Sequence, residues 1–417
     1  MLLKNAAIIS MAGPVSAGPP PRGDVLIEDG RIARVAPQIA GTAGGGAVDL
    51  RGRYLVPGLI DAHCHITISG GLVEEELAHD PRVRILRAAC NARETLRAGI
   101  TTIRDTCGLD DSDILLRDAV RAGHAPGPRI VACGRMITMT GGHGWFYGQE
   151  VDGPDAVRRA VRERVKARAD WVKFMASGGF AEEGEQPAAT QLDADELAAG
   201  VREANKAGRK TCAHAHGAAA IKNALRAGID SIEHASFLDQ EAIDLLLGRG
   251  AFIVPTFSIY YKMKETGGRH RLPPYVVDLA ARAWDLKVAR FLEARRAGVR
   301  FAAGSDNGSP AAAHPDIATE LEIFVRLGLS PYEALKAATV DAARLLGLDG
   351  EVGTVEEGKR ADLVIFGSDP LADISAVRRV DGVVKDGRLY GGPGDGRAAP
   401  PESAALEAAS PLAPAPP

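Results

Sequence analysis

Residues 56–66 read VPGLIDAHCHI, an apolar run that ends in two histidines separated by one residue. The apolar part of this run predicts a buried strand. Because side chains alternate between the two faces of a strand, His63 and His65 point to one face and Cys64 points to the other. Two imidazoles at this spacing can bind one metal ion together, so we take both histidines as candidate metal ligands.

Seven more strand-like segments follow along the chain. They are ITTIRDT (100–106), RIVACGRMIT (129–138), WVKFMAS (171–177), KTCAHAHG (210–217), SIEHAS (231–236), AFIVPTFS (251–258) and VRFAAGSDN (299–307). Amphipathic helical stretches, such as 81–99 and 276–298, or long loops separate them. Eight alternating units predict an α/β fold, a closed (β/α)8 TIM barrel. An open doubly wound sheet is the alternative, and it is disfavoured because no Gly-rich phosphate fingerprint follows the first strand.

The two ends of the chain differ from the middle in their sequence pattern. Residues 1–56 and 351–392 carry short β-type runs divided by turns that are rich in glycine and proline. We expect these segments to pair into a small β-sandwich domain formed by the N- and C-terminal segments, with the barrel over 57–350. Residues 393–417 are rich in proline, alanine and glycine and predict a disordered tail.

Composition excludes several classes of protein. The 417 residues include 50 Lys+Arg and 54 Asp+Glu, a net charge of −4, so no global basic field would attract nucleic acid or an anionic membrane. No apolar run reaches the roughly 20 residues needed to cross a bilayer. The five cysteines are scattered and form no CxxC pair, which favours a reducing, cytoplasmic location. We expect a small-molecule substrate.

The active site of such a barrel lies at the C-terminal ends of its strands. Lys173 lies inside the apolar run of the fourth strand, where a buried ammonium is costly unless it is paired. Burial lowers the pKa of a lysine, so the neutral amine could capture CO₂ and present the resulting carbamate as an oxygen ligand between two metals. The alternative is a lysine that points outward between the barrel and its helices.

Three later strands also end in residues that bind metals. The fifth ends in HAHG with His214 and His216, the sixth in EH with His234, and the eighth in SDN with Asp306. We take His214 and His234 as ligands, and His216 either contacts substrate or replaces His214 as a ligand. Asp306 can bind a metal and accept a proton from metal-bound water, although an aspartate at such a place also commonly caps a helix.

The segments VPGLIDAHCHI, WVKFMASGG, HAHG, IEHAS and AGSDNG together resemble the metal-dependent amidohydrolase superfamily, and GTVEEGKRADLVIF resembles its closing β strands. The TGGHG loop and the lysine of VKF resemble the branch of Xaa-Pro dipeptidases (prolidases), related carboxypeptidases and ochratoxin-type amidases. The resemblance covers about residues 1–390. It implies one binuclear site built from His63, His65, Lys173, His214, His234 and Asp306. Zinc is the default metal for these donors, and manganese and cobalt also suit them.

The resemblance also implies the reaction. A metal-bridging hydroxide would attack the C–N amide bond of a dipeptide or an N-acyl amino acid, with Asp306 as the proton carrier. His143 of GGHG, or His216, would stabilise the oxyanion. The same two histidines are candidate substrate contacts, together with Tyr260 and Arg269 from the loop after the seventh strand, which could hold a substrate carboxylate. An aromatic cluster after the third strand, Trp145 to Tyr147, could line an apolar pocket.

A mononuclear imidazolonepropionase-like cyclic amide hydrolase or a deaminase is the alternative reading. Such enzymes resemble this chain in the HxH motif and the late aspartate but lack the bridging lysine. Deaminases also place a glutamate shortly after the histidine of the fifth strand, where this chain reads HAHG. A third reading is a non-catalytic scaffold that has kept the fold. Such a protein should have lost metal ligands, whereas this chain retains a full set of candidates. Family members often form homo-oligomers, and no feature of this sequence decides the oligomeric state.

Overall fold

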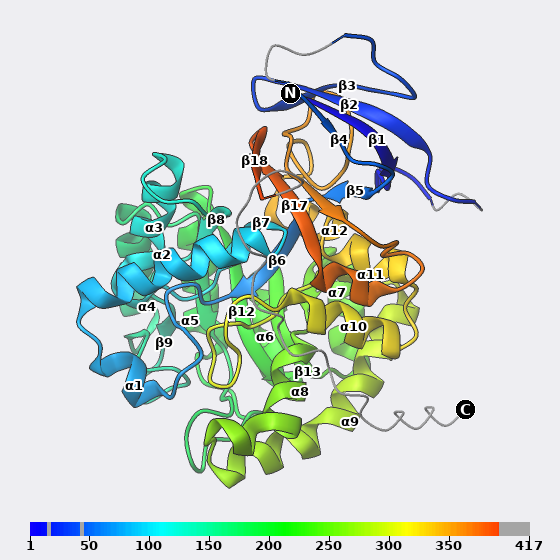
Figure 1. The fold of residues 1–417 in the computed structure, drawn as a ribbon. Helices are drawn as coiled ribbons and strands as arrows, with labels where there is room; N and C mark the ends of the chain where they lie inside the picture. The colour runs from blue at the N-terminus through cyan, green and yellow to red at the C-terminus, as the bar shows by residue number, and fades with distance from the viewer. Residues whose placement is uncertain (15–17, 42–45, 392–417) are drawn as a thin grey trace.

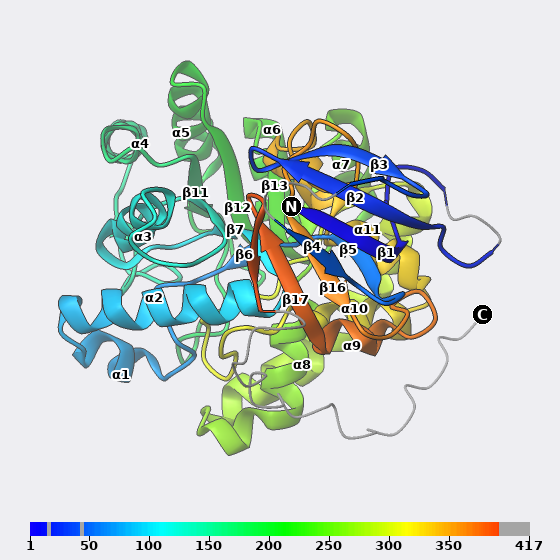
Figure 2. The ribbon, with the colours of Figure 1, turned by 45° about the horizontal axis from the view of Figure 1, so that its top comes forward.

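The computed structural model describes residues 1–14, 18–41 and 46–391 (Figure 1). The predicted C-terminal tail lies outside these residues. The middle of the chain forms the predicted parallel barrel, and the two ends form a β domain beside it (Figure 2). Within the described residues, no helix combines the length and the apolar character that a membrane span requires.

The eight barrel strands follow the predicted order. They are β6 (Leu59–Cys64), β7 (Ile100–Asp105), β8 (Arg129–Ala132), β11 (Trp171–Met175), β12 (Lys210–Gly217), β13 (Ser231–Phe237), β14 (Phe252–Val254) and β15 (Arg300–Phe301). Neighbouring strands within the two assigned sheets, β6 to β8 and β11 to β15, pair in parallel. Two short strands, β9 (Ile137–Thr138) and β10 (Gln149–Glu150), extend the edge beside β11.

Backbone hydrogen bonds close the barrel at its two remaining seams. Asp170 N donates to Ala132 O at 2.8 Å, which joins β11 to β8. On the other side, Ala62 N donates to Ala303 O at 2.9 Å and Asp306 N donates to His63 O at 2.8 Å. The second seam therefore holds the end of β6 directly against the segment that carries Asp306.

Helices surround the barrel (Figure 1). They are α1 (Val73–Ala78), α2 (Pro81–Arg97), α3 (Ser112–Arg121), α4 (Pro154–Lys166), α5 (Ala194–Lys206), α6 (Ala218–Ala227), α7 (Gln240–Arg249), α8 (Phe257–Thr266), α9 (Pro274–Ala297), α10 (Ile317–Arg326), α11 (Pro331–Ala337) and α12 (Val340–Leu346), with 3₁₀ turns η1 (Leu109–Asp111), η2 (Gly267–His270) and η3 (Ile374–Arg378). Local sequence explains their ends: Asp193 and Glu196 form a capping box on α5, and Gly228 ends α6 in a left-handed conformation.

The terminal domain unites strands from opposite ends of the chain. Its strands are β1 (Leu2–Ile8), β2 (Arg22–Glu28), β3 (Arg31–Ala36), β4 (Ala47–Asp49), β5 (Tyr54–Pro57), β16 (Leu363–Phe366), β17 (Val380–Lys385) and β18 (Arg388–Tyr390). They belong to one mixed sheet in the order β18-β17-β16-β5-β1-β2-β3, with β4 on β1. The antiparallel pairing of β5 with β16 is the junction between the two ends of the chain, and β5 leads directly into β6 of the barrel.

Candidate active site

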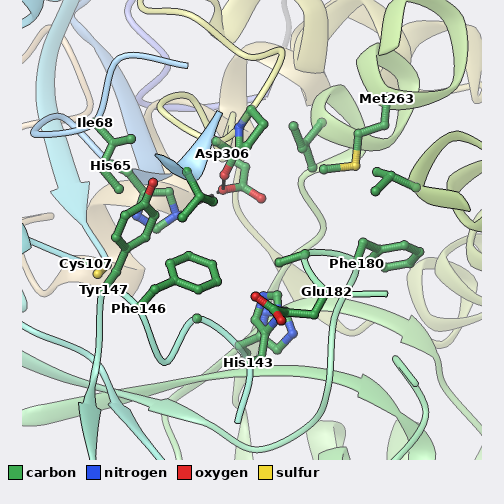
Figure 3. A pocket seen from close by; sticks show the side chains of 18 of the residues that line it. His65, Ile68, Cys107, His143, Phe146, Tyr147, Phe180, Glu182, Met263 and Asp306 are labelled. Atoms are coloured by element: carbon green, nitrogen blue, oxygen red, sulfur yellow. Dashed lines mark hydrogen bonds and ion pairs between the residues drawn. The ribbon is translucent and has the colours of Figure 1, made fainter. Parts of the chain in front are cut away.

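The predicted metal ligands meet in one cavity of about 380 Å³ at the C-terminal ends of the barrel strands. Its lining includes all six of them, together with His143, His216 and Tyr260. Lys173 therefore points into the barrel, not outward between strands and helices, and its side chain is buried. Figure 3 shows His65 and Asp306 side by side in this cavity, with His143 on another side of it.

Two groups of possible metal-binding atoms lie in the cavity. In the first, one ligand atom from each of His63, His65 and Asp306 lies within 4.8 Å of the others, and in the second the same holds for His214, His216 and His234. Asp306 connects the two groups. Its Oδ1 lies 3.1 Å from His65 Nε2 and 3.6 Å from His63 Nε2, and its Oδ2 lies 4.0 Å from His234 Nδ1.

The backbone around Asp306 is built to place this carboxylate. Asp306 has a left-handed φ of 56°, a conformation that side-chain-bearing residues rarely adopt. Buried Asp61 holds the preceding residue, because its Oδ1 accepts a hydrogen bond from Ser305 N at 3.0 Å and its Oδ2 accepts one from Ser305 Oγ. Gly308 has a φ of 101°, and a Cβ there would lie 2.3 Å from His65 O. The loop can therefore approach β6 only with glycine at this position.

His63 is oriented by a buried chain of charges. Glu233 Oε2 lies 2.6 Å from His63 Nδ1, and Glu233 Oε1 accepts a hydrogen bond from Arg104 Nη2 at 2.8 Å. Burial alone would raise the pKa of Glu233, but Arg104 and His63 together lower it to about 2, so Glu233 is a carboxylate. A carboxylate on Nδ1 leaves the Nε2 lone pair of His63 free to bind a metal facing Asp306.

The electrostatic state of the histidines suits metal binding. Burial, with a contribution from Lys173, lowers the pKa of His63 to about 4. Burial, and repulsion that a positive charge on either ring would meet from the neighbouring histidines and Lys173, hold the pKa values of His214 and His234 well below their usual range. Asp306 stays ionised, because His63 and His65 outweigh burial and hold its pKa well below the usual range. Neutral imidazoles and a carboxylate are the protonation states that bind divalent metals.

Three buried atoms on side chains that line the cavity have no hydrogen-bond partner among the described residues. They are His65 Nδ1, Tyr147 OH and His216 Nε2. Lys173 is 2% exposed and forms no ion pair or hydrogen bond within the described part of the chain. Such groups are costly to bury unless something else satisfies them. The donor set therefore fits divalent metal ions.

The two candidate oxyanion donors have different surroundings. His143 Nδ1 lies 2.8 Å from Glu185 Oε1, and its ring stacks on His214 with centroids 4.3 Å apart. His216 Nδ1 lies close to two hydroxyls, Ser236 Oγ at 2.9 Å and Tyr260 OH at 2.8 Å. Both imidazoles line the cavity.

The predicted substrate contacts are only partly brought together. Phe146 and Tyr147 line the cavity next to His65 (Figure 3), whereas Trp145 is not part of the lining and is 44% exposed. Arg269 is an exposed residue of η2 outside the lining, so it is not placed to bind a substrate in this cavity. The tight turn of η2 brings Arg271 to the cavity instead, where it pairs with Glu75 of α1.

Sequence reasoning missed the residues that support the ligands. Glu233 and Arg104 were read only as parts of strands, although an acidic and a basic residue inside apolar strands are a signal of a buried ion pair. Ser236 and Asp61 were also missed. Their roles depend on contacts with Tyr260 and Ser305, which are distant in sequence.

Comparisons with known proteins agree with this geometry. A model of the amidohydrolase family matches residues 54–390. An ochratoxinase from Aspergillus niger is 32% identical over 376 residues, which cover 82% of this chain and 76% of that protein. An imidazolonepropionase from Sphingopyxis alaskensis is 30% identical over 396 residues, covering 87% and 90%. A crystal structure of a Xaa-Pro dipeptidase with methionine bound in the active site superposes with a TM-score of 0.86 at 32% identity, covering 94% and 99%.

Proposed function

The chain belongs to the amidohydrolase family of hydrolases that act on C–N bonds, and we propose that it is a binuclear enzyme that cleaves the amide bond of a dipeptide or an N-acyl amino acid. The observation that carries the proposal is Lys173. It is buried in the cavity without an ion pair from the described residues, among the five other candidate metal ligands. A mononuclear site would not need an additional buried amine there.

The metals would be held by the six predicted ligands, with Lys173 carboxylated by CO₂ to supply a carbamate. Borderline nitrogen and oxygen donors favour zinc. Bound divalent ions would polarise the scissile carbonyl and lower the pKa of water, which supplies a nucleophile at neutral pH.

The chain's own residues would move the proton and hold the substrate. Asp306 is ionised and lies within 4.0 Å of imidazoles on both sides of the site, and this position supports a role in which it would accept a proton from the attacking water and return it to the leaving nitrogen. His143 and His216 supply imidazole groups beside the same space. Removing one oxyanion donor typically slows turnover by about 10²–10³.

The shape of the cavity supports an apolar substrate group. Its walls combine many apolar side chains with few charged ones, and Ile68, Phe146 and Tyr147 gather next to His65 (Figure 3). The relatives named above act, by their names, on ochratoxin and on Xaa-Pro dipeptides. An acyl group or N-terminal side chain of apolar character would lose its hydration on entering such a cavity, which favours binding.

Metal analysis together with a substrate panel tests this proposal. The panel contains dipeptides, N-acyl amino acids and cyclic amides, and the zinc content is measured per chain. We expect two zinc ions per chain, a carbamate carbon signal after growth with ¹³C-bicarbonate, and hydrolysis of the acyclic amides. Lys173→Met should lose the carbamate signal and bind at most one ion. One metal per wild-type chain with activity only on cyclic amides would favour the mononuclear alternative and refute the proposal.

A further inference from the structure

One guanidinium lies at the mouth of the cavity. Arg271 belongs to the cavity lining and its side chain is 70% exposed, so it stands between the active site and solvent. Among the described residues that line the cavity, the only lysine or arginine besides Arg271 is Lys173. Lys173 lies with the candidate metal ligands, so Arg271 is the cation available to an anionic group at the outer end of a substrate.

The backbone of η2 directs Arg271 to this place. Arg271 follows the 3₁₀ turn in a left-handed conformation with a φ of 60°, and its N donates to Gly268 O at 3.2 Å. The next residue, Leu272, is buried, and its N donates to Gly267 O at 3.0 Å. Buried Leu272 therefore fixes the chain beside the cavity, while Arg269, at the other end of the turn, stays exposed outside the lining.

The present partner of Arg271 is a carboxylate that solvent can readily replace. Arg271 pairs with Oε1 of Glu75 in α1, whose side chain is 46% exposed. The other oxygen of Glu75 accepts from Leu72 N at 3.2 Å, so the start of α1 keeps a hydrogen bond of its own. Exposed ion pairs are weak, and a substrate carboxylate offers the guanidinium the same kind of partner. Exchange of one carboxylate for the other therefore costs little.

The other charged side chains of the lining make the contribution of Arg271 measurable. Glu74 and Glu182 also line the cavity, and neither forms an ion pair within the described part of the chain. Without Arg271, a substrate carboxylate would meet only like charges from these residues and Glu75, which disfavour its binding. A preference for substrates with a free carboxylate must therefore come from Arg271, and it should reverse when the guanidinium is removed.

We infer that Arg271 determines specificity by binding the free carboxylate of the leaving amino acid, and that Glu75 occupies the guanidinium until this carboxylate replaces it. This inference rests on the proposed hydrolysis of dipeptides and N-acyl amino acids, and it adds the place where their carboxylate binds. Arg271 takes the role that was predicted for Arg269. The metals and the scissile bond then lie further inside the same cavity.

Pairs of compounds that differ only in this carboxylate test the inference on the zinc-loaded enzyme. The substrates are N-phenylacetyl-L-alanine and its carboxamide. N-(benzylsulfonyl)-L-alanine and its carboxamide carry a sulfonyl group in place of the scissile carbonyl, so isothermal titration can measure their binding without turnover. We expect the wild type to bind the acid of each pair more tightly than the carboxamide. Circular dichroism and zinc content verify that each variant is folded and loaded.

Arg271→Met should weaken binding of the acid by about tenfold, the loss of a hydrogen bond to a charged group, and leave the carboxamide unchanged, so that the preference reverses. KM for the acid substrate should rise by the same factor at constant kcat, because the contact is equal in the ground and transition states. The matched control is Arg269→Met, the same change outside the cavity lining, which should alter neither compound.

The exchange with Glu75 has a test of its own. Glu75→Gln removes the competing carboxylate, so it should strengthen binding of the acid by up to about fivefold, the strength of an exposed ion pair, without affecting the carboxamide. In the Arg271→Met background the same substitution should have a clearly smaller effect, because no guanidinium remains to be released.

Two results would overturn the inference. One is a wild type that binds the acid no more tightly than the carboxamide, which needs no variant to fold. The other is a folded Arg271→Met protein that binds both compounds as the wild type does, or loses both equally, as expected if the pair with Glu75 only holds the mouth together. Failure of the proposed function is a separate outcome, because the sulfonyl compounds report binding even if the substrate panel shows no hydrolysis of acyclic amides.

Discussion

Replacing Glu233 by glutamine tests the buried chain of charges that orients His63. Glutamine preserves the shape of the side chain and removes its negative charge. Arg104 and Glu233 are both 0% exposed and 2.8 Å apart, so the guanidinium would remain buried without its counter-charge. His63 would also lose the carboxylate that lies 2.6 Å from its Nδ1.

The size of the effect follows from these contacts. Removing one partner of a buried ion pair costs about 3–5 kcal/mol of folding stability. Loss of the carboxylate partner of a metal-binding histidine typically weakens metal affinity by about 10- to 100-fold. We therefore expect Glu233→Gln to be strongly destabilised without metal and to recover only part of that loss when zinc is added.

Urea unfolding followed by circular dichroism measures the stability of the metal-free and zinc-loaded protein, and isothermal titration measures zinc affinity. The control is Glu241→Gln, the same chemical change at an exposed position of α7, where Glu241 is 53% exposed and pairs with Lys222 and Arg226. Exposed ion pairs contribute little, so this variant should unfold like the wild type. Our account of His63 is refuted if Glu233→Gln unfolds at the wild-type urea concentration and binds zinc as tightly as the wild type.

Three more perturbations have expected outcomes. Burial raises the pKa of Glu320 from its ordinary 4.5 to about 7, so the folded state keeps a proton that the unfolded state loses, and this one group should lower the stability of the wild type relative to a variant without it by about 3 kcal/mol as pH rises from 4.5 to 7. Glu320→Gln should remove this slope in urea unfolding at pH 5 and 8, and equal slopes would contradict the assignment. Gly308→Ala places a Cβ 2.3 Å from His65 O at a φ of 101°, so it should lower the free energy of unfolding by about 1–3 kcal/mol. The control is Gly248→Ala in α7, where nothing surrounds the added Cβ, and it should raise the free energy of unfolding by about 0.5–1 kcal/mol. A Gly308→Ala protein as stable as the wild type would contradict the constraint on this loop. Removing metal with a chelator should lower Tm by calorimetry, because ions that bind only the folded state stabilise it, and an unchanged Tm would argue against bound metal.

The regular part of the fold was accessible from sequence. Eight apolar segments with intervening helical patterns predicted the barrel, because the alternation of side chains along a strand is local and leaves a pattern in the sequence. The terminal β domain was predicted for a similar reason, and the pairing of β5 with β16 confirms it. The candidate ligands, such as His63 and Asp306, were found because their residue types occur at strand ends, which meet at one rim of a barrel.

The sequence by itself therefore determined which strands form the barrel and which ligand types stand at its mouth. Only the tertiary structure decided how those ligands are held: that Glu233 orients His63, that Arg271 and not Arg269 reaches the cavity, and that the Nδ1 atom of His216 is enclosed by two hydroxyls. The sequence specifies the type of each residue, but the direction of its side chain and the groups that contact it depend on neighbours that are distant in sequence. His63 and Glu233, 170 residues apart, become hydrogen-bond partners only once the barrel has closed around them.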